Sequence, residues 1–266
     1  GGRFFVERKP NEKENMYHSY GGVCAFAWNK RLFYLRLLQS GGRTDGANLA
    51  DMVDSADESG GETEPILYSK DKTVLPELAG LYLKNSDLVG WISVEDTNIN
   101  YPVMQSKDNP DFYLKHDFDK GYSDYGCPYV QENCDVQKPS DNIIIYGHHM
   151  KNGSMFCDLE KFKSKDFWQE HKTVTFHTLT EKNEYEIVAV FKTVVYTDSA
   201  DSFKYYHFVN AETPEDFSAF IEKCKELSFY DTGVSAEYGD KLITLSTCEY
   251  SRSNGRLVVV AKKIAD

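Results

Sequence analysis

The chain has 266 residues, of which 41% are hydrophobic and 14% aromatic, so it is long enough to bury one large core. Its formal net charge of −12 at pH 7 argues against nucleic acid and an anionic membrane surface as partners, because both attract basic patches. The sequence has no run of 18 apolar residues, so it predicts no membrane-spanning helix.

The first part of the chain differs in composition from the rest. Residues 25–38 carry apolar residues at helical spacing, and residues 41–61 are rich in Gly, Ser, Asp and Glu, which is typical of a linker. We therefore interpret residues 1–64 as an N-terminal extension, partly helical, and residues 65–266 as the main folded domain.

The remaining residues show strand and helix patterns in irregular order. Apolar residues recur at helical spacing in three places, which predicts helices within residues 75–87, 155–171 and 213–229. Short runs of β-forming residues predict about eight strands, at residues 89–94, 99–104, 127–131, 142–146, 173–179, 185–196, 242–248 and 256–261. Pro102 places the second strand at an edge or a bend. The pattern alone indicates a mixed, mainly β barrel or sandwich.

Reactive side chains stand at the ends of predicted core strands. Cys248 ends one strand, and Arg256 opens the next after a turn at residues 253–255. A nearby cation lowers the pKa of a thiol below its free value of about 8.5. His148 follows the strand at residues 142–146. A cysteine and a histidine placed in this way are the parts of a thiol nucleophile with an acid/base partner.

The motifs around these residues resemble those of class B sortases, which are Gram-positive cell-surface transpeptidases. The two main motifs are Tyr146-Gly-His-His-Met150, continued by residues 151–156, and Thr244-Leu-Ser-Thr-Cys248, completed by Gly255 and Arg256. The likeness also covers residues 90–94, 99–103 and 105–108 and Tyr113. One motif alone would be weak evidence, but these occur in the family's order between about residues 75 and 264.

The resemblance implies a fold and a location. It implies an eight-stranded sortase-type β-barrel, mainly β with helices, with an N-terminal helix and a long helix before the nucleophile strand. Residues 65–266 would be the sortase catalytic domain. The family is anchored by its N-terminus at the extracellular face of the cell membrane, and this chain shows no anchor. We therefore expect a truncated, soluble form whose native counterpart touches the membrane only through that anchor.

The resemblance also implies roles for individual residues. Cys248 would attack a peptide carbonyl and hold the substrate as a thioester. The family's histidine directly follows the glycine, which selects His148, so His149→Ala is expected to keep most activity. Arg256 is preferred to Arg252 because it follows Gly255 and opens the valine-rich strand. Arg256 would stabilise the oxyanion, although a surface ion pair with Glu249 is the alternative.

Two neighbours of the nucleophile complete the predicted site. The positions of Ser246 and Glu249 contact the sorting signal in class B relatives, so we expect both to bind substrate. No cofactor is implied. Two adjacent histidines do not supply the three or four ligands of a zinc site, and no acidic cluster makes a convincing calcium site. Whether Cys127 and Cys134 form a disulfide is left open.

The predicted function is that of a cysteine transpeptidase. It would cleave the C-terminal sorting signal of an exported protein and transfer the acyl group to an amine of peptidoglycan or of a pilin lysine. Two alternatives share the same residues. One is a Cys-His peptide hydrolase that uses water as the acceptor, and the other is a non-catalytic cell-surface binding module with a vestigial site.

Overall fold

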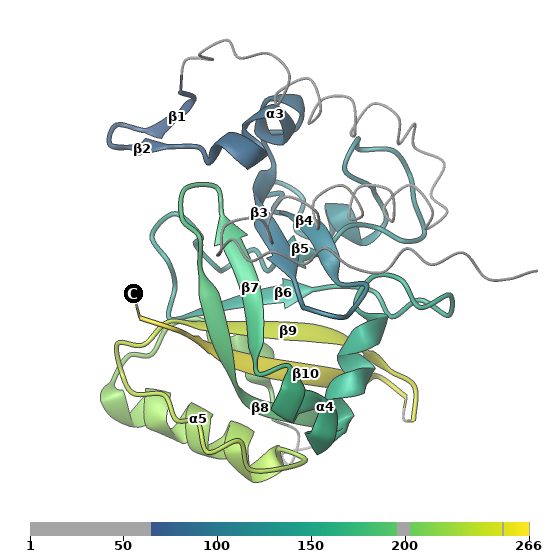
Figure 1. The fold of residues 1–266 in the computed structure, drawn as a ribbon, viewed down its shortest axis with the longest axis vertical. Coiled ribbons are helices and arrows are strands. Elements are labelled where there is room, and N and C mark those ends of the chain that lie inside the picture. The colour runs from purple at the N-terminus through teal and green to yellow at the C-terminus, as the bar shows by residue number, and fades with distance from the viewer. Residues whose placement is uncertain (1–64, 196–202, 252, 266) are drawn as a thin grey trace, which may run out of the picture. The chain divides into compact units, whose positions relative to one another are not determined.

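The computed structural model describes residues 65–195, 203–251 and 253–265 (Figure 1). The predicted extension at residues 1–64 and the competing arginine, Arg252, lie outside the described residues.

Eight strands close into one barrel. Around the barrel they are ordered β10-β8-β7-β3-β4-β5-β6-β9. Two of the eight ladders, β4 with β5 and β6 with β9, are parallel, and the others are antiparallel. The strands are β3 (Leu88–Ser93), β4 (Asn100–Met104), β5 (Tyr129–Val130), β6 (Asn142–Tyr146), β7 (Thr173–Thr178), β8 (Glu184–Val194), β9 (Leu242–Glu249) and β10 (Gly255–Lys263). The predicted eight-stranded barrel is therefore confirmed.

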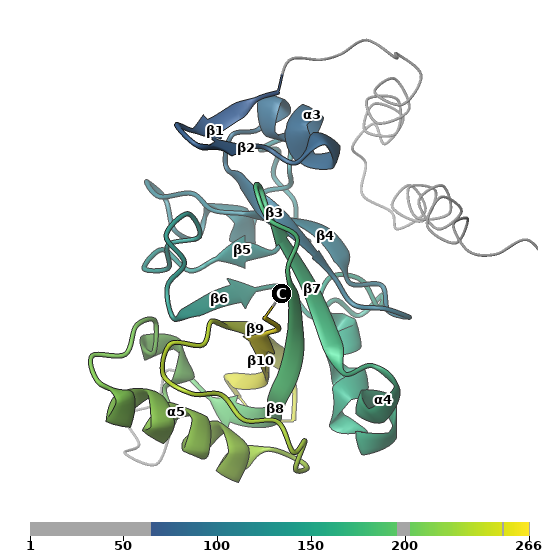
Figure 2. The same cartoon turned by 60° about the vertical axis from the view of Figure 1, so that its left-hand side comes forward.

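Short helices and one further hairpin surround the barrel (Figure 2). The helices are α3 (Pro76–Lys84), η1 (Phe112–Leu114), η2 (Cys157–Lys163), α4 (Lys165–Glu170), η3 (Tyr205–His207) and α5 (Pro214–Leu227), where η denotes a 3-10 helix. The hairpin of β1 (Leu67–Ser69) and β2 (Lys72–Thr73) was not predicted. Its strands have three and two residues, too few to show an alternating pattern.

The N-terminal helix expected within residues 75–87 is confirmed as α3, and it ends at the polar residues 85–87. Asn85 has an extended backbone, with φ −145° and ψ 106°, and so stops α3 after Lys84. The Asn85 amide donates to the Tyr113 hydroxyl at 2.9 Å and to the Phe118 carbonyl at 2.7 Å. The Asn85 side chain thus forms hydrogen bonds with groups of the following loop, and the extended backbone of Asn85 ends the helix.

The predicted long helix before the nucleophile strand is α5. Thr213 and Asp216 form a capping box at its start, and Pro214 occupies its first turn, where a missing N–H costs nothing. The buried face of α5 packs against the outside of β8 and β10 (Figures 1 and 2). The residues of this face are Phe217, Phe220, Ile221 and Cys224.

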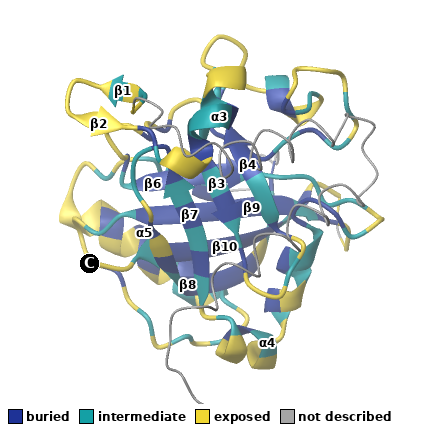
Figure 3. Cartoon of the chain, turned by 45° about the horizontal axis from the view of Figure 1, so that its top comes forward, coloured by how far each residue is buried: buried dark blue, intermediate teal, exposed yellow. Residues whose placement is uncertain are grey.

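Alternation along β9 and β10 separates two hydrophobic cores. Ile243 and Leu245 of β9 point into the barrel and share a core with Leu257 and Val259 of β10. Leu242, Val258 and Val260 point outward and pack under α5. Buried residues accordingly fill the barrel strands, while β1 and β2 are largely exposed (Figure 3). The same alternation assigns Cys248 and Arg256 to the outer face of the barrel.

Pro102 lies where the barrel tolerates a missing donor. It pairs with Trp91 of β3, whereas the other neighbour of its strand, β5, contacts β4 only at Met104. The prolyl nitrogen therefore lies on a stretch that is paired on one side, as the edge or bend prediction required.

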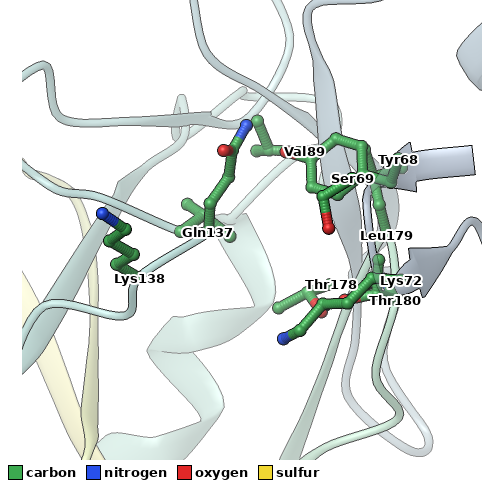
Figure 4. Close-up of a pocket in the computed structure, with 10 residues that line it drawn as sticks. Tyr68, Ser69, Lys72, Val89, Gln137, Lys138, Thr178, Leu179 and Thr180 are labelled. Carbon is green, nitrogen blue, oxygen red and sulfur yellow. Dashed lines mark hydrogen bonds between the residues drawn. The ribbon is translucent and has the colours of Figure 1, made fainter.

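One cavity of about 160 Å³ lies between the β1–β2 hairpin, residues 136–138 and the turn after β7 (Figure 4). Gln137 and Lys138 precede β6 in the chain, whereas His148 follows it, so this cavity is at the other end of that strand. Its ten lining residues include neither cysteine nor histidine. The cavity is therefore separate from the predicted site.

No helix within the described residues has the length and apolar character that crossing a membrane requires. Cys127 and Cys134 are both free thiols. The disulfide between them that the sequence left open is therefore not formed.

Candidate active site

The β9–β10 ladder places Cys248 directly opposite Arg256. Opposite residues of an antiparallel pair project from the same face of the sheet, with Cβ atoms about 4.5–5.5 Å apart. Both side chains are half-buried. The Arg256 guanidinium donates from Nη1 to the Gly255 carbonyl at 2.9 Å, which holds it against the start of its own strand. A thiol and a permanent cation therefore share one end of the outer face.

The parallel β6–β9 ladder brings His148 to the same end. Tyr146 is paired with Ser246, and Gly147 then donates to the Ser246 carbonyl at 3.1 Å. Continuing this register by two residues places His148 beside Cys248. The sequence predicted that each of the two residues lies at the tip of a core strand, and the structure adds that the two strands are neighbours.

The loop at η1 orients the imidazole of His148. Its Nε2 lies 2.8 Å from the Leu114 carbonyl oxygen. A carbonyl only accepts hydrogen bonds, so Nε2 carries the proton. In the neutral ring, Nδ1 is then the nitrogen that can accept a proton.

Gly147 is required by the close approach of Phe156. A Cβ atom at Gly147 would lie 2.5 Å from Cγ of the Phe156 ring, far inside van der Waals contact. Phe156 is fully buried, and its N–H donates to the His148 carbonyl at 2.8 Å. Gly153, with φ +83°, and Met155, with φ +59°, turn the chain back so that this contact forms. The turn at residues 153–155 thus fixes the backbone of His148.

His149 faces the main chain of the nucleophile. Its Nδ1 lies 2.9 Å from the Cys248 carbonyl oxygen and 3.9 Å from Glu160 Oε1. The ring meets Tyr250 edge to face, with ring centroids 5.0 Å apart. The Tyr250 hydroxyl in turn donates to the His149 carbonyl at 2.7 Å. Adjacent histidines therefore make different contacts, as expected at the end of a strand.

Glu249 is buried in a network of hydrogen bonds and ion pairs. Its Oε1 lies 3.1 Å from Lys163 Nζ and 3.0 Å from Lys192 Nζ, and its Oε2 accepts from the main chain and hydroxyl of Ser251. Burial by itself raises the pKa of this carboxyl, but the hydrogen bonds from Ser251, Lys192 and Lys163 outweigh it and lower the pKa to about 2. These partners occupy both carboxylate oxygens. No Glu249–Arg256 ion pair occurs among the described contacts.

Ser246 is also buried, at 1% exposure, and its hydroxyl lies 2.6 Å from the Tyr205 hydroxyl. Two residues earlier in β9, Thr244 donates to the Asn142 side chain at 2.8 Å. Asn142 in turn donates to the Phe208 carbonyl at 2.8 Å. The polar residues of the nucleophile motif thus tie β6 and β9 to the segment at η3, which borders the outer face near Cys248.

The other described cysteines are poor candidates for a nucleophile. Burial raises the pKa of Cys127 to about 12 and that of Cys134 to about 11, and it also raises the pKa of Cys157 and Cys224. These thiols stay protonated at neutral pH, and the thiolate is the reactive form. Within the described residues, no group of three His, Cys, Asp or Glu side chains could hold a metal ion.

Two contributors to the site were not found from the sequence. Leu114 acts through its main-chain carbonyl, which no side-chain pattern reveals. Tyr250 follows the nucleophile by two residues and could have been noticed as an aromatic residue next to the motif. Its partner, however, is His149, 101 residues earlier.

Comparisons with known proteins identify the family of the chain. The family model described as the sortase domain matches residues 92–264. Sortase B of Listeria monocytogenes is 36% identical over 209 residues, which cover 74% of this chain and 81% of the relative. Sortase B of Staphylococcus aureus is 33% identical over 193 residues, which cover 72% and 76%.

A solved structure shows the same fold. The structure of a Staphylococcus aureus sortase B–substrate complex aligns with a TM-score of 0.67 and 28% identity, over 89% of this chain and 97% of that one. The barrel order, the helix before the nucleophile strand and the sequence identity lead to one assignment. The chain belongs to the sortase family as a class B sortase, a cysteine transpeptidase of cell-wall anchoring.

Proposed function

We propose that Cys248, His148 and Arg256 carry out the transpeptidation. The observation that supports this most strongly is the register of three strands. Cys248 is paired with Arg256 across β9 and β10, and the β6–β9 register brings His148 to the same end. His148 precedes Cys248 by 100 residues in the sequence, whereas Arg256 follows it by eight, and the register of the strands supports one site at one end of the outer face.

In the first half-reaction, Nδ1 of His148 holds the proton of the Cys248 thiol, and Cys248 attacks the carbonyl carbon of the scissile peptide bond as the thiolate. A C–S bond forms, and the carbonyl electrons move onto oxygen. Arg256 donates hydrogen bonds to this oxyanion, and its fork of N–H groups suits an oxygen that gains charge in the transition state. The C–N bond then breaks, and protonated His148 gives its proton to the leaving amine. The acyl group remains on the cysteine as a thioester.

In the second half-reaction, an amine attacks the thioester carbon. His148 takes the proton from the attacking nitrogen, and the thiolate of Cys248 leaves. Because Leu114 binds Nε2, we assign both proton transfers to Nδ1 of His148. Water in place of the amine would give hydrolysis, so the identity of the acceptor separates a transpeptidase from a peptidase.

The proposed donor is the C-terminal sorting signal of an exported protein. The related Staphylococcus aureus sortase B has been solved as a substrate complex, which supports a peptide ligand of this kind. The proposed acceptor is an amine of peptidoglycan or of a pilin lysine, at the extracellular face of the membrane. The burial of Ser246 and Glu249 favours a supporting role over direct contact, so substrate binding by these two residues stays a prediction.

A ligation assay tests this proposal. The protein is incubated with a library of sorting-signal peptides, with and without an added amine, and the products are identified by mass spectrometry. We expect a peptide–amine product and a thioester adduct on Cys248, both absent from Cys248→Ala. His148→Ala should be nearly inactive. Cleavage without ligation at saturating amine would instead identify a hydrolase, and turnover by Cys248→Ala would refute the nucleophile.

A further inference from the structure

We propose that His149 and Tyr250 form a reciprocal clamp that sets the spacing between His148 and Cys248. His149 is thus a positioning residue for the reaction, which acts through the main chain of the nucleophile. This inference rests on the proposed function for its kinetic consequence. The contacts between His149 and Tyr250 that form the clamp do not depend on the proposed function.

The clamp lies where the regular sheet ends. The β6–β9 ladder runs from Asn142 to Tyr146, and Gly147 adds one more bond to the Ser246 carbonyl. β6 ends there, while β9 continues to Glu249. His148 and Cys248 therefore lie just beyond the last ladder bond between their strands, and other contacts must hold them in register.

Two side-chain hydrogen bonds cross this gap in opposite directions. His149 donates from Nδ1 to the Cys248 carbonyl at 2.9 Å, and Tyr250 donates from its hydroxyl to the His149 carbonyl at 2.7 Å. Each segment gives one donor and one main-chain acceptor. The edge-to-face contact of the two rings, with centroids 5.0 Å apart, adds a third link between the same segments.

The contacts on either side keep the clamp rigid. The His149 side chain is only 15% exposed, whereas Tyr250 is 68% exposed and covers it. Glu160 lies 3.9 Å from Nδ1 and is also paired with Lys163, which contacts Glu249. His149, which contacts the Cys248 carbonyl, and Glu249, which follows Cys248, are therefore both tied to η2.

The consequence concerns the chemical step more than substrate binding. A loosened clamp lets the imidazole of His148 and the thiol of Cys248 move apart, although both groups are still present. Misplacement of a catalytic group by about 1 Å can cost on the order of 10²-fold in rate. The loop that carries His148 retains its other contacts, so it should move by less than this distance. We therefore expect kcat of His149→Ala to fall on the order of 10-fold and KM to change less than twofold. This differs from the sequence-based expectation that His149→Ala keeps most activity.

The test uses the full chain and compares His149→Ala with His149→Asn. The Asn side chain can place its Nδ2 donor where the imidazole Nδ1 lies, so it should restore kcat to within about threefold of the wild type. Tyr250→Phe keeps the ring contact and loses only the hydroxyl bond, so its loss should be smaller than that of His149→Ala.

His171→Ala is the matched control. The Nδ1 of His171 also lies 2.9 Å from a main-chain carbonyl, that of Phe167, but this contact is within the end of α4. His171→Ala should lower the melting temperature with no change in kcat. A merely structural role for His149 would make the two alanine variants behave alike.

A second measurement does not depend on activity. Amide hydrogen exchange of residues 247–250 should be faster in His149→Ala and Tyr250→Phe, and should return to the wild-type rate in His149→Asn. Unchanged exchange and unchanged kcat in His149→Ala would overturn the clamp. So would an equal loss in His149→Ala and His149→Asn. Absence of any ligation by the wild type would refute the proposed function, and the exchange rates would then still decide the clamp.

Discussion

The two segments that meet at the site are held in different ways. Cys248 and Arg256 lie on long neighbouring strands, where every residue from Gly255 to Lys262 has a partner on β9. His148 lies in a loop that is held by the Leu114 carbonyl and by the Phe156 ring, which packs against Gly147. The hydrogen bond from His149 to the Cys248 carbonyl holds the same loop. The proposed nucleophile and its cation thus lie on the sheet, whereas the proposed acid/base is held by tertiary contacts. Substitutions in the β9–β10 sheet and in the loop that carries His148 should therefore have different effects.

The largest effect is expected on the sheet side. Arg256→Lys keeps the positive charge and loses the planar pair of donors, so kcat should fall on the order of 10²–10³ if Arg256 stabilises the oxyanion. Circular dichroism should report an unchanged fold, because the strand backbone is untouched. Arg252→Lys is the control and should cost little. Wild-type turnover in Arg256→Lys would show that charge alone suffices.

The loop side should respond to packing. In Gly147→Ala the new methyl group meets the Phe156 ring at 2.5 Å, so the loop that carries His148 must shift. We expect a loss of about 1–3 kcal/mol of unfolding free energy and a fall of about 10-fold in kcat, which denaturant melts and kinetics would measure.

The double variant Gly147→Ala/Phe156→Leu makes room for the methyl group. It should recover part of both losses relative to Gly147→Ala. If Gly147→Ala alone matches the wild type in both measurements, the loop does not depend on this contact.

Glu249, the residue after Cys248, gives a pH-dependent prediction. Its pKa is lowered from 4.5 to about 2, so its stabilisation is complete above pH 4.5 and is lost as the pH falls towards 2. Glu249→Gln should lose on the order of 2 kcal/mol at pH 7. The difference from the wild type should shrink at pH 3, as measured by denaturant unfolding.

Glu226→Gln provides the comparison for that experiment. Glu226 pairs with Lys223 on the surface of α5 and is 67% exposed, so its loss should cost at most about 0.5 kcal/mol. A difference between wild type and Glu249→Gln that stays constant from pH 7 to pH 3 would contradict the proposed network.

The smallest effect is expected from the N-terminal part of the chain. Removal of residues 1–64 should leave kcat within a few-fold, since the sortase match begins only at residue 92. Matched ligation assays on the two chains would measure it. A large loss with an unchanged circular dichroism spectrum would show that residues 1–64 contribute to the site.

The sequence was sufficient to predict the eight barrel strands, the helices α3 and α5 and the catalytic candidates. Buried strands such as Asn142–Tyr146 have continuous apolar runs, and the helix after Thr213 has a capping residue, a proline and an apolar face. Such signals are local, because each depends on residues close together in the chain. His148, Cys248 and Arg256 became candidates because each lies at the end of such an element, and the family resemblance then selected His148 over His149 and Arg256 over Arg252.

Only the tertiary structure decided how these residues are oriented. Leu114, Phe156 and Tyr250 contact the histidine segment from different parts of the chain, and all three contacts use a main-chain atom that a side-chain pattern cannot reveal. The burial of Ser246 and Glu249 likewise depends on Tyr205, Lys163 and Lys192. Strand identity follows from local sequence, whereas the partners of a side chain at a strand end depend on barrel closure, which brings distant segments together.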